Sequence, residues 1–446
     1  MIDFDLLKKR IDKSRTYRFL GQVSKVSGLV VESVGPTTRV GELCHIFSSD
    51  EDKLYQAEVI GFNENKVLLM PLGITAGIKL GDQVEATGEL PQVGVSPQLL
   101  GRILNGMGEP IDEKPPIIPE TYKSIHGTPI NPLTRSKITD LFSTGIRVID
   151  GLLTCGVGQR IGIFAGSGVG KSTLLGMIAR QSSADVNVIS LVGERGRELS
   201  AFIENDLGPE GLKRSVIVIS TSDNPPLIRM RAALMATAVA EYFRDQGKNV
   251  LLMMDSVTRF AMAQREVGLS AGEPPSSKGY TPSVFALLPQ LLERAGNFRN
   301  GSITAIYTVL VEGDDMNEPI ADSVRSILDG HIVLSRKLAA KNHYPAIEVL
   351  DSVSRLMNEL VSPEQNQLAG KIRDFLATYR EAEDLINIGA YASGSNPNID
   401  QSIVFNEPIT EFLKQRVGDF SNHDRALEGM AQIFGLDIHN LPAATK

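Results

Sequence analysis

Cysteine is scarce in this chain of 446 residues, which has two, Cys44 and Cys155. Two cysteines are too few for a disulfide framework or a cysteine-bound metal cluster, and this scarcity is typical of the reducing cytosol. Long apolar runs are lacking as well, since a stretch such as Val250–Met254 falls far short of the roughly 18 residues of a membrane span. The first ten residues lack a basic stretch followed by an apolar core, so we expect no secretory signal.

An excess of positive charge is also absent, because 45 Lys and Arg stand against 53 Asp and Glu, for a net charge of −8. The net charge therefore gives no support for nucleic-acid binding over the whole surface. A local basic channel is still compatible with this net charge. The hydrophobic fraction of 42% and the charged fraction of 22% are those of a globular protein. A chain of this length has room for two or three domains with substantial cores.

A glycine-rich segment stands between a short apolar stretch and a helical one that opens at Lys171. This strand–loop–helix order is that of the P-loop, which binds the phosphates of ATP or GTP. Backbone N–H groups of the loop converge on phosphate oxygens, the Lys171 charge suits the β- and γ-phosphates, and the Ser172 hydroxyl suits Mg²⁺. Ala165 replaces the first glycine of the pattern. The expected phosphate-binding residues are Gly166, Ser167, Gly168, Val169, Gly170, Lys171, Ser172 and Thr173.

Two acidic residues stand at the ends of other apolar stretches. Asp255 closes the stretch Asn249–Asp255, and an acid at the carboxyl end of a neighbouring parallel strand can belong to the Mg²⁺ shell. Glu194 follows another predicted strand, and a carboxylate there can orient the water that attacks the γ-phosphate. From spacing alone, a strand-end Asp can instead cap a turn, and a charged residue after a strand can be an ordinary solvated one.

Three segments are expected before the P-loop domain proper. Residues 1–16 form a helical arm with an apolar face, which either packs on its own domain or binds a partner. In residues 17–95, apolar and polar residues alternate over short stretches that turn residues separate. This pattern is typical of a small closed β-barrel. Few aromatics lie on these strands to stack on bases, which favours an assembly module. A proline-rich connector beginning near Gly101 is expected to be an ordered loop.

The region 140–350 alternates β-like and helical stretches, which predicts a parallel sheet with crossover helices. The last 90 or so residues show helical spacing of apolar side chains. The predicted fold class is therefore α/β, with a P-loop NTPase core, an N-terminal β-barrel and a C-terminal helical domain. We expect the ATPase domain at 96–358 and the helical domain at 359–446. The central strands are expected at Arg160–Ala165, Val186–Val192, Ser215–Thr221, Val250–Asp255, Ile303–Val309 and His331–Leu334.

Six segments together resemble the ATPase of bacterial type III protein export, a family similar to the catalytic subunits of rotary ATP synthases. The resemblance runs from about Tyr17 to the C-terminal helices. Two stretches, Ser172–Ala179 and Asp314–Pro319, are more similar to the flagellar branch than to the virulence-injectisome branch. The six segments are Phe164–Thr173, Gly193–Glu198, Asp255–Arg265, Gly272–Phe285, Gly313–Asp322 and Ile327–Ala339.

The resemblance implies roles for individual residues. Glu194 matches the carboxylate that polarises the attacking water, while Arg195 and Arg259 match arginines that gather around the γ-phosphate. Tyr344 matches the aromatic that stacks on adenine. Arg355 matches an arginine finger, which one subunit donates into the site of its neighbour.

Three assignments stay open. Tyr391 is a candidate for the second wall of the adenine pocket. Tyr344 could instead be a packed loop tyrosine, and Arg355 a surface ion-pair residue, the usual fate of a lone loop arginine.

The resemblance implies Mg²⁺-dependent ATP hydrolysis at the interfaces of a homohexamer that energises type III export. Because two motifs are more similar to the flagellar branch, the expected cargo is flagellar components. The resemblance also implies a cytoplasmic location, at the inner face of the cytoplasmic membrane. The implied partners are a regulatory stalk-like protein at the N-terminal arm, a coiled-coil central protein, the export gate, and export substrates with their chaperones, without nucleic acid.

Three alternative functions stay open. The first is an injectisome ATPase. The second is a non-catalytic rotary ATPase subunit, which Glu194 and Lys171 disfavour because such subunits usually lose one of the two. The third is a ring-shaped RNA helicase, for which the aromatic-poor barrel offers little RNA-binding surface.

Overall fold

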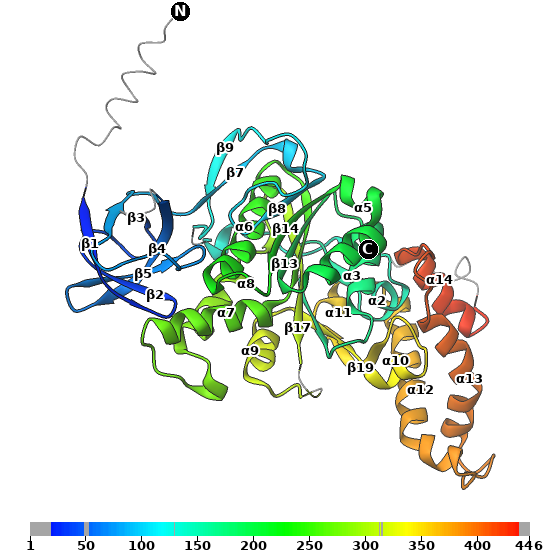
Figure 1. The fold of residues 1–446 in the computed structure, drawn as a ribbon. Helices are drawn as coiled ribbons and strands as arrows, with labels where there is room; N and C mark the ends of the chain where they lie inside the picture. Colours follow the sequence, from blue (N-terminus) through cyan, green and yellow to red (C-terminus); the bar gives the residue numbers. More distant parts are fainter. Residues whose placement is uncertain (1–18, 49–52, 129, 312, 314, 437–446) are drawn as a thin grey trace, which may run out of the picture.

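The computed structural model describes residues 19–48, 53–128, 130–311, 313 and 315–436. The predicted N-terminal arm lies outside these residues. Figure 1 shows a β-barrel, a central sheet covered by helices, and a group of helices that extends from the opposite side of the centre. The predicted fold class is confirmed. Among the described residues, no helix combines the length and the apolarity that crossing a membrane requires.

The barrel closes with the strand order β1-β2-β5-β4-β3-β6. Alternate residues point inward, so that Val31, Ile46, Leu69 and Val84 form its core. Gly28 has a φ of 59° in the turn between the first two strands, a conformation that glycine adopts without strain. The barrel strands are β1 (Leu20–Ser27), β2 (Val30–Val34), β3 (Leu43–Ser48), β4 (Lys53–Asn63), β5 (Lys66–Pro71) and β6 (Gln83–Ala86).

Most of the connector is loop, as expected, but it also contains two short strands that were not predicted. Strand β8 (Arg102–Asn105) pairs in parallel with the edge of the central sheet, and β9 (Thr121–Ser124) pairs with β7 (Gln92–Val95). The prolines between these strands do not interrupt them, and buried Leu104 anchors β8 in the core. A pair of hydrogen bonds from Arg102 to Asp112, of 2.8 and 2.9 Å, fastens the turn after β8.

The central sheet has the strand order β19-β18-β12-β17-β15-β13-β14-β8, and β16 pairs beside β17. All neighbours from β18 to β8 run parallel, whereas β19 is antiparallel to β18. Two further strands form a small separate ladder. The strands are β10 (Leu141–Phe142), β11 (Cys155–Gly156), β12 (Arg160–Ala165), β13 (Val186–Glu194), β14 (Ser215–Thr221), β15 (Asn249–Asp255), β16 (Gly296–Asn297), β17 (Ser302–Leu310), β18 (Gly330–Leu334) and β19 (Ile347–Ser354).

Helices cover both faces of this sheet, because its strands are apolar on both sides. In β15, Leu252 and Met254 face one hydrophobic cluster and Leu251 and Met253 face the other. Each such side chain contributes about 1.5–3 kcal/mol on burial. The helices of this domain are α2 (Arg147–Leu152), α3 (Lys171–Gln181), α4 (Gly196–Ala201), α5 (Gly208–Lys213), α6 (Pro226–Asp245), α7 (Val257–Ser270), α8 (Pro282–Leu292), α9 (Pro319–Ile327), α10 (Arg336–Ala340) and α11 (Met357–Leu360).

Three helices complete the chain: α12 (Pro363–Asn387), α13 (Pro397–Leu413) and α14 (His423–Ile433). The rings of Phe375 and Phe405 stack with centroids 5.0 Å apart, and Phe434 joins them from the end of α14. Leu368 and Ile372 of α12 extend the second core cluster of the central domain. The helical group is therefore packed against the domain that carries the P-loop.

Candidate active site

The P-loop joins β12 to α3 at the carboxyl end of the parallel strands. Gly168 and Gly170 have φ values of 78° and 86°, which strain any residue other than glycine. A Cβ added at Gly168 would meet no atom of the described chain within 4 Å, so the loop is open on this side. The first N–H groups of α3 have no partner within the helix, and together with the loop they form a cradle for phosphate.

The Lys171 ammonium lies between two carboxylates from neighbouring strands. Its Nζ atom is 2.5 Å from Oδ1 of Asp255, at the end of β15, and 3.9 Å from Oε1 of Glu194, at the end of β13. The hydroxyl of Thr308, on β17, donates to the same Asp255 oxygen at 2.7 Å. The ends of β12, β15 and β13 thus bring together Lys171, Asp255 and Glu194, which the sequence predicts to bind phosphate, to bind the metal and to orient water, respectively.

Glu194 is only 14% exposed at its side chain. Burial raises the pKa of this carboxyl group, the charge of Asp255 raises it too, and Lys171 and Arg259 oppose the rise, so that the pKa moves from 4.5 to about 7. A carboxylate whose pKa lies near neutrality can accept a proton from water and release it again.

Of the two arginines predicted to surround the γ-phosphate, one lies at the site and the other is exposed to solvent. The stem of Arg259 packs on Gly193, where a Cβ would come within 3.2 Å of it, and the buried Nε of Arg259 has no hydrogen-bond acceptor in the described chain. The Arg195 side chain is 81% exposed and lies 3.7 Å from Glu198, one turn further along α4. Within one chain, the structure therefore brings Arg259 to the site and leaves Arg195 in solvent.

A cavity of about 990 Å³ opens beside the P-loop, where Tyr344 forms one wall. The segment after α13 forms the opposite wall, and its Gln415 N–H donates to the Tyr344 carbonyl at 2.9 Å. The residues of this wall could not be placed from the sequence because no motif marks them. The cavity is lined by Arg147, Gly168, Gly170, Thr173, Leu174, Met177, Asn342, Tyr344, Pro345, Glu411, Lys414, Gln415, Arg416, Val417 and Asp419.

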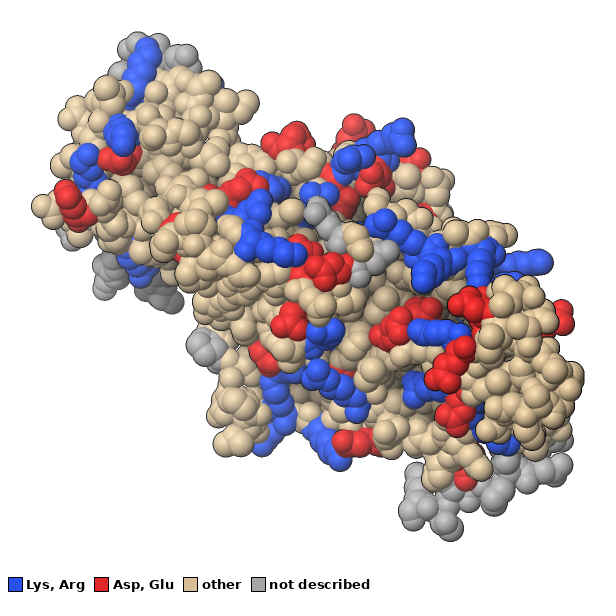
Figure 2. Space-filling model, turned by 90° about the horizontal axis from the view of Figure 1, so that it is seen from below, with Lys and Arg blue, Asp and Glu red and all other residues tan. Residues whose placement is uncertain are grey.

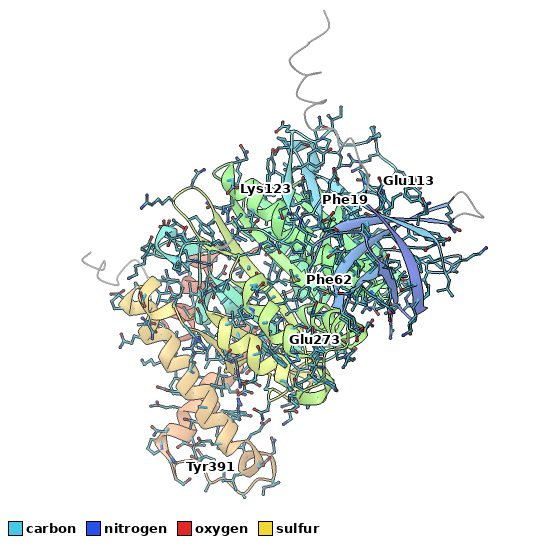
Figure 3. The ribbon with its side chains drawn as sticks, turned by 90° about the vertical axis from the view of Figure 1, so that its left-hand side faces the viewer. Phe19, Phe62, Glu113, Lys123, Glu273 and Tyr391 are labelled. Carbon is cyan, nitrogen blue, oxygen red and sulfur yellow. The ribbon has the colours of Figure 1, made fainter. Side chains whose placement is uncertain are left out.

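Tyr391, considered for the second wall, is not part of this cavity. It lies at the far tip of the C-terminal helices, as Figure 3 shows. Its hydroxyl donates to the Asn396 carbonyl and to Asp400, each at 3.0 Å, and so closes the turn between α12 and α13. The candidate was wrong because an aromatic near the end of the chain fits a turn as well as a pocket.

Strand β19 explains where Arg355 lies. Because β19 is antiparallel, its first residue, Ile347, pairs with the last residue of β18, and Ser354 pairs with the first, Gly330. Tyr344 precedes β19 and is close to the P-loop, whereas Arg355 follows β19 at the opposite edge of the sheet. The paired strand β18, from Leu334 to Gly330, spans roughly 13 Å, and Arg355 lies beyond its far end, so Arg355 cannot reach the phosphate site of its own chain.

Oxygen donors at the site fit a small divalent cation. The Ser172 hydroxyl and the Asp255 carboxylate are the hard ligands that Mg²⁺ prefers, with substrate phosphates and water completing the shell. The mutual repulsion of Asp255 and Glu194, visible in the raised Glu194 pKa, is relieved by such a cation.

The fold and this site define a P-loop nucleoside triphosphatase with an N-terminal barrel and a C-terminal helical domain. Family models match all three parts: the ATP synthase alpha/beta family beta-barrel domain at residues 23–88, the nucleotide-binding domain of that family at 145–354, and the T3SS EscN ATPase C-terminal domain at 361–432. The chain belongs to the family of flagellar and type III secretion ATPases, as the sequence resemblance predicted.

The similarity covers almost the whole chain. A flagellum-specific ATP synthase of Bacillus subtilis is 54% identical over 95% of this chain and 97% of its own length. A type 3 secretion system ATPase of Xanthomonas euvesicatoria is 49% identical over 93% and 94%. The assembled ATPase EscN of enteropathogenic E. coli superposes with a TM-score of 0.88 at 46% identity, over 93% of this chain and 99% of that one.

Proposed function

We propose that this chain hydrolyses ATP with Mg²⁺ at the interfaces of a homohexameric ring and so energises type III protein export. The observation that carries the proposal is the geometry of β19: Tyr344, which lines the cavity beside the P-loop, precedes the strand, and Arg355 follows it at the opposite end. Such a chain has one half of a site at each edge. Two copies side by side complete one site, and a closed ring completes all of them.

In the proposed reaction Glu194 accepts a proton from the water that attacks the γ-phosphorus, and the bond from that phosphorus to the ADP oxygen breaks. Lys171 and Arg259 stabilise charge on the γ-phosphate oxygens, and Arg355 of the neighbouring copy adds a further cation. Arg195 can join them only if α4 or the next copy brings it closer. Bound Mg²⁺, held by Ser172 and Asp255, would supply charge neutralisation on the β- and γ-phosphates.

We place the site of action in the cytoplasm, at the inner face of the cytoplasmic membrane, with flagellar components as the cargo. The stretches Ser172–Ala179 and Asp314–Pro319, whose sequences are more similar to the flagellar branch, support this choice. A solved EscN complex contains a central stalk, EscO, and superposes on this chain with a TM-score of 0.85. By analogy we propose a coiled-coil central protein, a regulatory stalk-like protein at the N-terminal arm, the export gate, and export substrates with their chaperones as partners.

The RNA helicase alternative has less support. Basic and acidic side chains are interspersed over the face in Figure 2, instead of gathering into the continuous basic groove that tracks single-stranded nucleic acid. A non-catalytic subunit is disfavoured by the pairing of Lys171 with two carboxylates, which such a subunit does not need.

The pH dependence of kcat/KM should report Glu194. Because its pKa is raised to about 7, the ionised base is lost as the pH falls through that value. We expect kcat/KM to rise between about pH 6 and pH 8 and to fall nearly tenfold per unit well below pH 7. Rates measured at constant ionic strength check this, and a profile that stays flat down to about pH 5 would assign the base to a group with an ordinary carboxyl pKa.

Tyr344→Ala should raise the KM for ATP with little change in kcat, because the ring is expected to stack on the base and not to touch the γ-phosphate. Base–aromatic stacking contributes about 1–3 kcal/mol, so KM should rise roughly 5- to 150-fold. Tyr344→Phe keeps the ring and is the matched control. An unchanged KM in the alanine variant would show that the base binds elsewhere.

The proposed activity is tested by phosphate release from ATP with the full chain, with and without EDTA and with and without single-stranded RNA. We expect hydrolysis that needs Mg²⁺, ignores RNA and is abolished in Lys171→Ala. Stimulation by RNA would favour a helicase, and absence of hydrolysis at every protein concentration would favour a non-catalytic subunit. A motility assay of a strain that carries Lys171→Ala tests the flagellar branch.

A further inference from the structure

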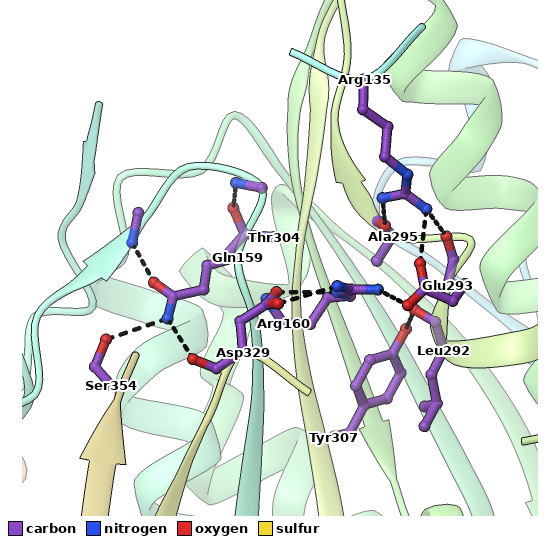
Figure 4. A network of polar contacts seen from close by, with 12 residues as sticks. Arg135, Gln159, Arg160, Leu292, Glu293, Ala295, Thr304, Tyr307, Asp329 and Ser354 are labelled. Atoms are coloured by element: carbon purple, nitrogen blue, oxygen red, sulfur yellow. Dashed lines mark hydrogen bonds and ion pairs between the residues drawn. The ribbon is translucent and has the colours of Figure 1, made fainter. Parts of the chain in front are cut away.

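A partly buried polar cluster lies at the edge of the sheet opposite the P-loop, where Figure 4 shows its contacts. Its centre consists of Gln159, Arg160, Asp329 and Ser354, which we call the anchor cluster. These residues come from the start of β12, the turn before β18 and the end of β19. None of them lines the nucleotide cavity, so the proposed chemistry of their own chain leaves the cluster unexplained.

Gln159 is fully buried, and its amide group is fully used. Its Nε2 donates to the Asp329 carbonyl and to the Ser354 hydroxyl, each at 3.1 Å, while its Oε1 accepts from the Gly156 N–H at 2.8 Å. A buried amide that satisfies three bonds is costly to disturb, because each lost partner leaves a desolvated polar group. Gln159 therefore ties the ends of β18 and β19 to the start of β12.

Asp329 is held from two sides. Its carboxylate accepts from the backbone N–H of Arg160 at 3.1 Å and from the Arg160 guanidinium at 3.0 Å through each of two nitrogens. Arg160 in turn pairs with Glu293, after α8. The Asp329 carbonyl then accepts from the backbone N–H of Arg355 at 3.0 Å.

The cluster thus fixes the backbone of Arg355 and leaves its side chain outside. Ser354, the residue before it, also donates through its hydroxyl to the Thr154 carbonyl at 2.7 Å. Within the described chain, the recorded hydrogen bond of the Arg355 guanidinium goes to the Arg325 carbonyl at 3.3 Å. A rigid backbone beneath an exposed arginine is the arrangement expected for a cation that acts on another molecule.

We infer that Gln159, Asp329 and Ser354 are positioning residues for Arg355, which aim its guanidinium at the phosphates bound by the neighbouring copy. The inference rests on the proposed function and adds the residues that hold the finger. A misplacement of about 1 Å can cost 100-fold in rate, so a loosened anchor should lower kcat. Nucleotide binding should not change, because each chain binds nucleotide at the far end of β12.

The test uses Ser354→Ala and Gln159→Leu in the full chain, with Ser354→Thr as the conservative variant that keeps the hydroxyl. We expect kcat to fall about 10- to 100-fold for Ser354→Ala, with unchanged affinity for a fluorescent ATP analogue, and Ser354→Thr to restore most of the rate. Lys137→Ala, which removes an exposed ion pair with Glu359, is the matched control and should keep the parental rate.

Rings that contain two different variants distinguish positioning of Arg355 from a merely structural role of the anchor cluster in its own chain. Ser354→Ala chains have an intact P-loop, and Lys171→Ala chains have an intact finger and anchor. We expect the mixture to be more active than either variant alone, and to reach the same specific activity as a mixture of Arg355→Ala with Lys171→Ala.

The outcomes of this mixing experiment differ for the two proposals. If Arg355→Ala is rescued and the anchor variants are not, the anchor acts within its own chain and this inference is wrong. If Arg355→Ala alone hydrolyses ATP at the parental rate, the shared site itself fails. Loss of nucleotide affinity in Ser354→Ala would also reject the inference, because it would show damage to the site of the same chain.

Discussion

Glu194→Gln should lower kcat about 100- to 10,000-fold while leaving ATP affinity unchanged. The amide keeps the size of the side chain and its place beside Lys171, but it cannot accept a proton from the attacking water. The contacts that hold the nucleotide come from the P-loop and the cavity around Tyr344, which this change does not touch.

Steady-state phosphate release and binding of a fluorescent ATP analogue measure the two halves of this prediction. Glu210→Gln makes the same chemical change on the exposed surface of α5, where Glu210 pairs with Lys213, and should behave like the parent chain. If Glu194→Gln hydrolysed ATP nearly as fast as the parent, another group would have to serve as the base.

Arg355→Ala should lower kcat by about 1,000-fold or more, the usual contribution of an arginine finger. Arg355 follows β19 at the edge far from its own P-loop, so the same variant should bind ATP with parental affinity. Arg355→Lys should restore little, because an ammonium lacks the planar fork that contacts two phosphate oxygens at once.

Sedimentation with ATP distinguishes a lost cation from a lost ring. We expect Arg355→Ala to form rings at the same protein concentration as the parent chain and to be inactive within them. Parental turnover would mean that Arg355 is an ordinary surface residue. Failure to form rings would instead assign Arg355 to the interface itself.

The sequence predicted the parts of this molecule that local chemistry determines. The strands Arg160–Ala165 and Ser215–Thr221 begin and end at the predicted residues, since turn residues border these apolar stretches. The strand–loop–helix order around Lys171 was equally clear, because glycine and lysine at fixed spacing have few other uses. The carboxyl ends of parallel strands then had to bring Glu194 and Asp255 to the same edge.

Features that depend on long-range pairing were not predictable in the same way. The four residues of β8 form a strand because β14 offers an edge to pair with, and nothing in their own sequence distinguishes them from the proline-rich connector. The wall around Gln415 exists because the C-terminal helices fold back onto Tyr344. The opposite placement of Tyr344 and Arg355 needs the antiparallel direction of β19, which no motif in the sequence encodes.

The roles of individual site residues stay predictions, although their geometry is consistent with most of them. Lys171, Glu194 and Asp255 meet within one chain, and Arg259 lies beside them. Arg195 and Arg355 do not approach the P-loop of their own chain. For Arg355 that distance is the strongest argument for a site shared between copies.

The measurement that tests this shared site most directly is the specific ATPase activity of the full chain across a range of protein concentrations. Our account predicts that activity per chain climbs as copies associate and then levels off when rings are complete, with ring formation by sedimentation following the same curve. A constant activity per chain, down to concentrations at which sedimentation finds single chains, would contradict it.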